Sequence, residues 1–217
     1  MPTPKAGYFL ADGTRVPGTT TITGRFKESG GLIHWAWQLG HDGKDYRTER
    51  DKAADVGTII HEQADAAIHK QEIPQPPADF SDAQREQVRR GFEAFWAWYQ
   101  NTVTEITWTE RQLVSERYRF GGTPDAYGTD KQGSGCLFDW KSGGIYQDAL
   151  IQVGGGYGLL LDENGFPVTG GYHIVRFGKD TGDFVHRYYP ELDLARRQFI
   201  LLREAYENDK LLKKRAQ

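Results

Sequence analysis

The chain has 217 residues, 38% of them hydrophobic and 26% charged, and a formal net charge of −3. This composition is typical of a folded globular protein and excludes a disordered or fibrous chain. The negative charge argues against a protein that coats nucleic acid by neutralising its phosphates. A chain of this length can bury a sizeable core, so we expect a single domain over residues 1–217.

The apolar segments and the cysteine content further narrow the class of protein. No stretch is long and apolar enough to span a bilayer, and Met1–Lys5 lacks the apolar core of a signal peptide. We therefore expect a cytoplasmic protein with no membrane partner. The single cysteine, Cys136, can form no internal disulfide and cannot supply the thiolates of a zinc or iron–sulfur centre.

Apolar residues at helical spacing predict three helices in the first half of the chain. The first is a short amphipathic helix over Gly31–Leu39, and the second covers about Thr48–His69. A Pro-rich loop follows, and then Ser81 and Gln84 form the capping box of a third helix.

The periodicity changes to two after Val103 and predicts strands. Alternation over residues 113–120 indicates one strand. Thr123–Thr129 and Cys136–Lys141 flank a polar, glycine-containing turn, so they should form an antiparallel hairpin. Gly171–Phe177 and Phe184–Tyr189 predict a second hairpin.

Two more helices complete the pattern. One covers Ile145–Leu161 although it contains Gly154, Gly155 and Gly156, which suggests close approach of another backbone or of DNA. The other runs from Leu192 to about Leu212. Helices followed by hairpins with a helix between them indicate an α/β or α+β fold, in which helices flank a mixed central β-sheet.

The first predicted hairpin brings two carboxylates and an ammonium group together. A turn about Gln132 places Asp125 opposite Asp139, and Lys141 shares a strand face with Asp139. Paired carboxylates suit Mg²⁺, and the lysine can orient or deprotonate a water or offset charge in a transition state. A surface salt bridge would need no function, but apolar neighbours such as Trp140 are unusual for solvated carboxylates.

These residues carry a family resemblance. Gly122-Thr123-Pro124-Asp125, followed by Leu137-Phe138-Asp139-Trp140-Lys141-Ser142, resembles the PD-(D/E)XK nuclease superfamily, in particular its RecB-like and phage exonuclease branch. The resemblance implies a restriction-endonuclease-like core and a Mg²⁺- or Mn²⁺-dependent DNA nuclease in a bacterial cell or phage-infected host. It favours exonuclease over endonuclease action.

Supporting motifs extend the resemblance over about residues 20–160. Gly57-Thr58-Ile59-Ile60-His61 resembles a helix that brings an imidazole to the metal, and Thr20–Thr23 before Trp35 resembles the threonine-rich opening of that branch. The segment with Gln152 and Tyr157 resembles the helix after the catalytic lysine, although the family spacing is four residues and here it is five.

The resemblance therefore implies three sets of site residues. The implied metal ligands are His61, Asp125 and Asp139, and the implied catalytic residues are Asp125, Asp139, Lys141 and Gln152. Glu116 and Tyr157 are further candidates. The cysteines that frame an iron–sulfur cluster in some relatives are missing, so no cluster is expected.

Two other functions stay open at this point. The first is a catalytically silent nucleic-acid-binding or assembly protein of the same fold. The second is a metallopeptidase, because His61-Glu62 followed by Asp65 resembles a zinc-protease helix with an altered second ligand. Expected partners are DNA and a helicase, a recombinase or a single-strand-binding protein.

Overall fold

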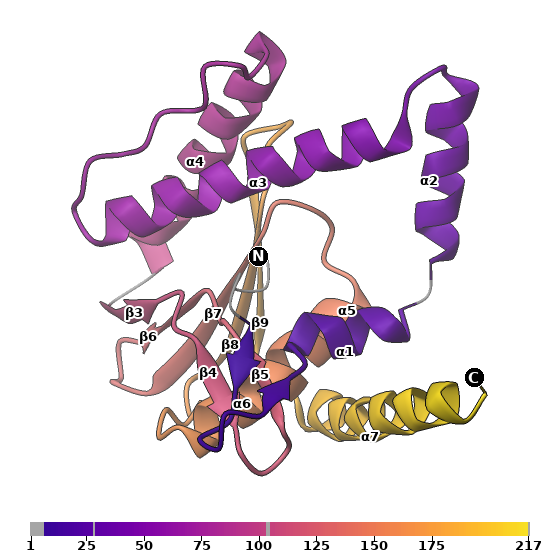
Figure 1. Cartoon of the computed structure of the whole chain (residues 1–217). Coiled ribbons are helices and arrows are strands. Elements are labelled where there is room, and N and C mark those ends of the chain that lie inside the picture. The colour runs from indigo at the N-terminus through magenta and orange to yellow at the C-terminus, as the bar shows by residue number, and fades with distance from the viewer. Residues whose placement is uncertain (1–6, 28, 103–104, 217) are drawn as a thin grey trace.

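The protein is built around a five-stranded mixed β-sheet flanked by helices (Figure 1). A computed structural model describes residues 7–27, 29–102 and 105–216. The sheet order is β3-β6-β7-β8-β9. The bounds of these strands are Glu105–Thr109, Ala126–Thr129, Gly135–Lys141, Gly171–Phe177 and Phe184–Tyr189. This mixed α/β architecture is the fold class that the sequence predicts.

Strand directions follow from the connections between strands. The two predicted hairpins, β6-β7 and β8-β9, are antiparallel, and Ala126 pairs with Phe138 in the first of them. That register corresponds to the predicted turn about Gln132. Strand β6 begins at Ala126 and not at Thr123, and Pro124 has no N–H with which to extend the ladder. Strands β7 and β8 are parallel, which requires a crossover between them.

The crossover is a continuous helical segment of three parts, α5 (Gln147–Leu150), η1 (Ile151–Tyr157) and α6 (Gly158–Glu163). A helix over Ile145–Leu161 was expected, but η1 is a π-helix. A β-carbon on Gly155 would lie 2.4 Å from Phe199 Cβ, so the glycine allows η1 to pack closely against α7 (Asp193–Arg215). Close packing of η1 against α7 is therefore sufficient to explain why residue 155 is a glycine.

Four helices remain in the described residues, and the two longest of them pack on one face of the sheet. They are α1 (Thr19–Arg25), α2 (Gly30–His41), α3 (Tyr46–Ile68) and α4 (Asp82–Thr102). Helices α3 and α4 lie in the upper part of Figure 1 and α7 in the lower part. The Ser81 N–H donates to Gln84 Oε1 at 3.1 Å and the Gln84 N–H to Ser81 Oγ at 3.3 Å, which confirms the capping box. Within the described ranges, no helix combines the length and apolar character needed to cross a membrane.

Strand β7 lies between two cores. Leu137 packs in an apolar cluster with residues of η1, α6 and α7, whereas Phe138 and Trp140 pack in a second cluster with residues of α3 and α4. Because side chains alternate along a strand, Asp139 and Lys141 share the face of Leu137 and point toward η1. This alternation positions the candidate site.

The predicted single strand over residues 113–120 is wrong. The segment forms parts of two short paired strands, β4 (Leu113–Ser115) and β5 (Phe120–Gly122), with a turn between them. Arg119 takes a φ of 55° in that turn. The Glu163 carboxylate accepts hydrogen bonds from the Glu116 and Arg117 N–H groups, at 2.9 and 3.1 Å. A residue of α6 therefore stabilises a turn that strand periodicity does not reveal.

Three strands have no counterpart among the predictions. They are β3 and the small hairpin of β1 (Tyr8–Phe9) and β2 (Arg15–Val16). Each is short and gives little periodic signal. Strand β3 matters most, because its pairing with β6 leads directly into the candidate site.

Candidate active site

Three side chains from separate parts of the chain converge beside β7. His61 lies on α3, Glu110 directly follows β3, and Asp125 directly precedes β6. One ligand atom of each, an imidazole nitrogen or a carboxylate oxygen, lies within 4.8 Å of the other two. Nitrogen and oxygen donors at this separation form a possible cation site.

The pairing of β3 with β6 brings Glu110 to Asp125. Thr109 pairs with Ala126, and the Glu110 N–H donates to the Asp125 carbonyl oxygen at 2.9 Å. Glu110 has a φ of 50°, a left-handed conformation that is uncommon outside glycine. Such conformations occur where the surrounding structure enforces them, and they cluster at functional sites.

The first hairpin brings Asp125 to Asp139 and Lys141. Asp125 is buried, and its Oδ2 accepts a hydrogen bond from the Trp140 N–H at 2.6 Å. Asp139 is fully buried, and its Oδ1 has no hydrogen-bond partner in the described structure. Lys141 Nζ lies 2.7 Å from Asp139 Oδ2. Two carboxylates and one ammonium group therefore meet on this side of β7.

Two residues of η1 extend the polar group. Lys141 Nζ donates to Gln152 Oε1 at 3.3 Å, and Gln152 Nε2 donates to the hydroxyl oxygen of Tyr157 at 2.7 Å. The hydrogen bonds of a π-helix join residues five apart, so Gln152 and Tyr157 share one face. The π-helix thus accommodates the five-residue spacing that departs from the family pattern.

Gly57 allows α3 to approach the end of β7. A β-carbon on Gly57 would lie 2.6 Å from Ser142 Oγ, which is closer than real contacts allow. One helical turn later, the His61 ring makes an edge contact with the Trp140 ring, with 6.0 Å between centroids. His61 Nδ1 is buried and has no hydrogen-bond partner in the described part of the chain.

Burial and mutual charge set the protonation of these groups. Burial raises the pKa of Asp125 and of Asp139, and the nearby Lys141 ammonium only partly offsets it. Burial lowers the pKa of His61 to about 4, so the imidazole is neutral near pH 7 and keeps a free lone pair. Burial alone would lower the pKa of Lys141, but Asp139 and Asp125 outweigh it and raise the pKa.

These donors fit a divalent cation. An unpartnered buried imidazole nitrogen and an unpartnered buried carboxylate oxygen are costly unless something binds them. Mn²⁺ binds carboxylate oxygens together with an imidazole nitrogen, whereas Mg²⁺ prefers oxygen ligands such as these carboxylates. His61, Glu110 and Asp125 would hold such an ion, and the unpartnered Oδ1 of Asp139 would be a further ligand.

Glu110 should make cation binding pH-dependent. Burial, with the Asp125 and Asp65 carboxylates, raises the pKa of Glu110 to about 8, so its carboxyl group holds a proton at neutral pH. Binding must displace that proton, so Mn²⁺ affinity should rise between about pH 6 and pH 8. Titration calorimetry in buffers of different ionisation enthalpy should find about one proton fewer released by Glu110→Gln than by wild type.

Glu116→Gln is the matched control for this measurement, because Glu116 lies in the β4-β5 turn. Its proton release should equal that of wild type. Equal proton release by Glu110→Gln and wild type would remove Glu110 from the cation site.

The structure brings most of the sequence-predicted residues together. His61 and Asp125 belong to the donor group, Asp139 and Lys141 adjoin it, and Gln152 and Tyr157 form a chain of contacts from Lys141. Glu116 lies elsewhere, because the turn after β4 directs it to the surface. Its Oε1 accepts a hydrogen bond from the Ala11 N–H at 2.7 Å.

Sequence reasoning missed Glu110. The residue belongs to no motif, and it meets Asp125 only through the β3-β6 pairing. Recognising Glu105–Thr109 as a strand antiparallel to β6 would have placed Glu110 opposite Asp125. That strand has only 5 residues, so its periodicity is weak.

A scan against models of protein families found none that matches the chain, and a search of curated proteins found no match.

Proposed function

We propose that the protein is a Mg²⁺- or Mn²⁺-dependent nuclease that hydrolyses phosphodiester bonds of DNA. The observation that carries the proposal is the convergence of His61, Glu110 and Asp125 beside the buried pair of Asp139 and Lys141. A bound divalent ion would supply an activated water and would polarise the scissile phosphate. Buried carboxylates of raised pKa in such a cluster are typical of functional sites.

Lys141 serves the transition state in this proposal. The Asp139 carboxylate and the Gln152 amide oxygen hold its ammonium group in place. The raised pKa keeps Lys141 protonated, so the residue can donate hydrogen bonds but cannot accept a proton. Its role is therefore to orient the attacking water and to stabilise charge that develops on the phosphate oxygens.

Gln152 and Tyr157 act as positioning residues. The Tyr157 hydroxyl group accepts a hydrogen bond from the Gln152 amide, which fixes the orientation of the amide oxygen toward Lys141. Burial raises the pKa of Tyr157 well above its ordinary value, so its hydroxyl group stays protonated. The two residues thus hold the ammonium group without entering the reaction.

The other candidate functions have less support. A metallopeptidase would need Asp65 as its second metal ligand. Asp65 instead accepts a hydrogen bond from the Thr109 hydroxyl group, and one of its carboxylate oxygens lies 3.5 Å from Nε2 of His69. It is not a member of the donor group. No observation specifically favours a silent binding protein, since all the acidic groups and Lys141 are present. Exonuclease action and a cytoplasmic location belong to the same proposal as expectations from the sequence.

A cleavage assay tests the proposal. Linear and circular DNA are incubated with the protein in Mg²⁺, Mn²⁺, Zn²⁺ or EDTA, and products are resolved on a gel. We expect cleavage in Mg²⁺ or Mn²⁺ and none in EDTA, because the carboxylates cannot activate water alone. Loss of linear DNA with intact circles would indicate exonuclease action. Full activity in EDTA, or no cleavage under any condition, would refute the proposal.

A further inference from the structure

An open groove lies beside the start of the helical crossover that carries Gln152. It lies between the end of α1, the outer helix α2, the start of α5 and helix α7, and its volume is about 810 Å³. Pockets of roughly 300–1,000 Å³ typically bind small organic groups. Ile151 lines this groove, and the next residue, Gln152, contacts Lys141. The groove and the proposed catalytic lysine are therefore linked by adjacent residues of η1.

The groove is aromatic and carries amide side chains. Phe26, Trp35 and Tyr146 line it from three different segments, and their side chains are 42%, 36% and 67% exposed. Gln147 and Gln198 also line it. Contiguous exposed apolar surface is uncommon in monomeric proteins and marks interaction sites. Flat rings stack on other planar groups, and amides pair with the polar edges of bases.

Helix α2 lacks core packing in the described structure. The expected amphipathic helix is present, but none of its residues is buried. Its described aromatic contact with α3 is an edge contact between Trp35 and Tyr46, with ring centroids 5.3 Å apart. Figure 1 shows α2 standing beside the rest of the molecule. A helix of this length is marginal in water without packing, so an occupant of the groove would stabilise it.

We propose that this groove binds unpaired bases of a DNA single strand next to the active site. The inference rests on the proposed nuclease function and specifies its substrate as a single strand or a frayed end. Bases inside a duplex are already stacked and cannot enter a groove of this kind. Lys27 and Asp148 form an ion pair of 2.6 Å within the lining, so their charges offset and favour bases over phosphates.

A peptide or a second copy of the chain could also cover apolar surface. The amide groups and the exposed aromatic rings favour unpaired bases. The other occupants are therefore outcomes of the test.

Binding measurements in EDTA test the proposal without cleavage. Fluorescence anisotropy of a labelled oligothymidine of about twelve nucleotides is compared with that of a blunt duplex. Tyr146→Ala and Trp35→Ala should each weaken single-strand binding by about tenfold, because stacked aromatic rings contribute that much per base. Binding of the blunt duplex should not change.

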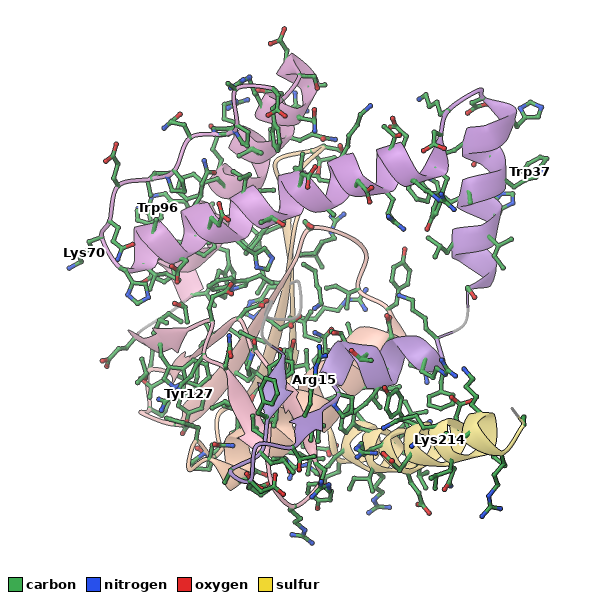
Figure 2. The ribbon with its side chains drawn as sticks, viewed as in Figure 1. Arg15, Trp37, Lys70, Trp96, Tyr127 and Lys214 are labelled. Carbon is green, nitrogen blue, oxygen red and sulfur yellow. The ribbon has the colours of Figure 1, made fainter. Side chains whose placement is uncertain are left out.

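Trp37→Ala is the matched control, since Trp37 is 63% exposed on the same helix and does not line the groove. Figure 2 shows its side chain pointing away from the molecule. This variant should bind both DNAs like wild type. Hydrogen exchange supplies a second readout, in which the single strand should slow exchange in α2 of wild type and not of Tyr146→Ala.

Three outcomes would overturn the groove assignment. They are unchanged single-strand affinity in both groove variants, equal losses in Trp37→Ala, and a dimer that dissociates in Trp35→Ala. Failure of the proposed nuclease function would give a different result from failure of the groove assignment. Wild type would then bind single strands through the groove but would not cut them in Mg²⁺ or Mn²⁺. Cleavage by wild type with normal binding by the groove variants would refute the groove alone.

Discussion

Replacing Lys141 with alanine should slow DNA cleavage on the order of 10³-fold, because it removes roughly 4 kcal/mol of transition-state stabilisation. The ammonium group is 2.7 Å from Asp139 Oδ2 and hydrogen-bonded to Gln152, so its position is fixed before substrate arrives. The lysine donates no lone pair while it is charged and is no ligand of a cation. Affinities for Mn²⁺ and DNA should therefore be largely retained.

Two measurements check this expectation. Single-turnover cleavage gives the rate of the chemical step, and calorimetry gives the affinity for Mn²⁺. Lys131→Ala, in the turn between β6 and β7, is the control and should cleave like wild type. If Lys141→Ala cleaves within a few-fold of wild type, the Asp139–Lys141 contact is only a structural ion pair.

Asp139→Asn should lose cation binding and cleavage together. The side chain keeps its shape, so packing around the site is conserved, but the amide presents a weaker oxygen ligand and no charge. Burial raises the pKa of Asp139, which means that its charged form is unfavourable in the cation-free protein. Removing the charge should therefore leave the melting temperature in EDTA unchanged or higher. Residues that serve function often lower the stability of the folded protein.

Thermal unfolding with and without Mn²⁺ measures this effect. Mn²⁺ should raise the melting temperature of wild type, because a ligand that binds the folded state stabilises it. It should raise that of Asp139→Asn much less. Glu116→Gln removes a carboxylate outside the donor group and should respond like wild type. An undiminished response of Asp139→Asn would place the cation away from Asp139.

Local chemistry made much of the fold predictable. The polar turn between β6 and β7 and the alternation of β7 are encoded within a few residues, so the register that brings Asp125 to Asp139 follows from sequence. The capping box at Ser81 and Gln84 is equally local. The pairing of Asp139 with Lys141 on one face needs only the two-residue period of a strand.

The conformation of η1 shows the limit of periodicity. The apolar pattern predicts a helix correctly, but it does not distinguish an α-helix from a π-helix. Close packing of Gly155 against Phe199 on α7 involves residues far apart in sequence. The π-helical turn that joins Gln152 to Tyr157 is therefore a property of the folded molecule.

The sequence by itself determined the hairpins, the main helices and the group of Asp125, Asp139 and Lys141, since each depends on turn chemistry or periodicity over short distances. Tertiary structure decided that Glu110 joins His61 and Asp125, because a long-range strand pairing and a left-handed backbone conformation place it there. It also decided that the turn at Glu116 points away from the site. That turn is stabilised by Glu163, 47 residues further along the chain, and local patterns carry no information about a contact of that separation.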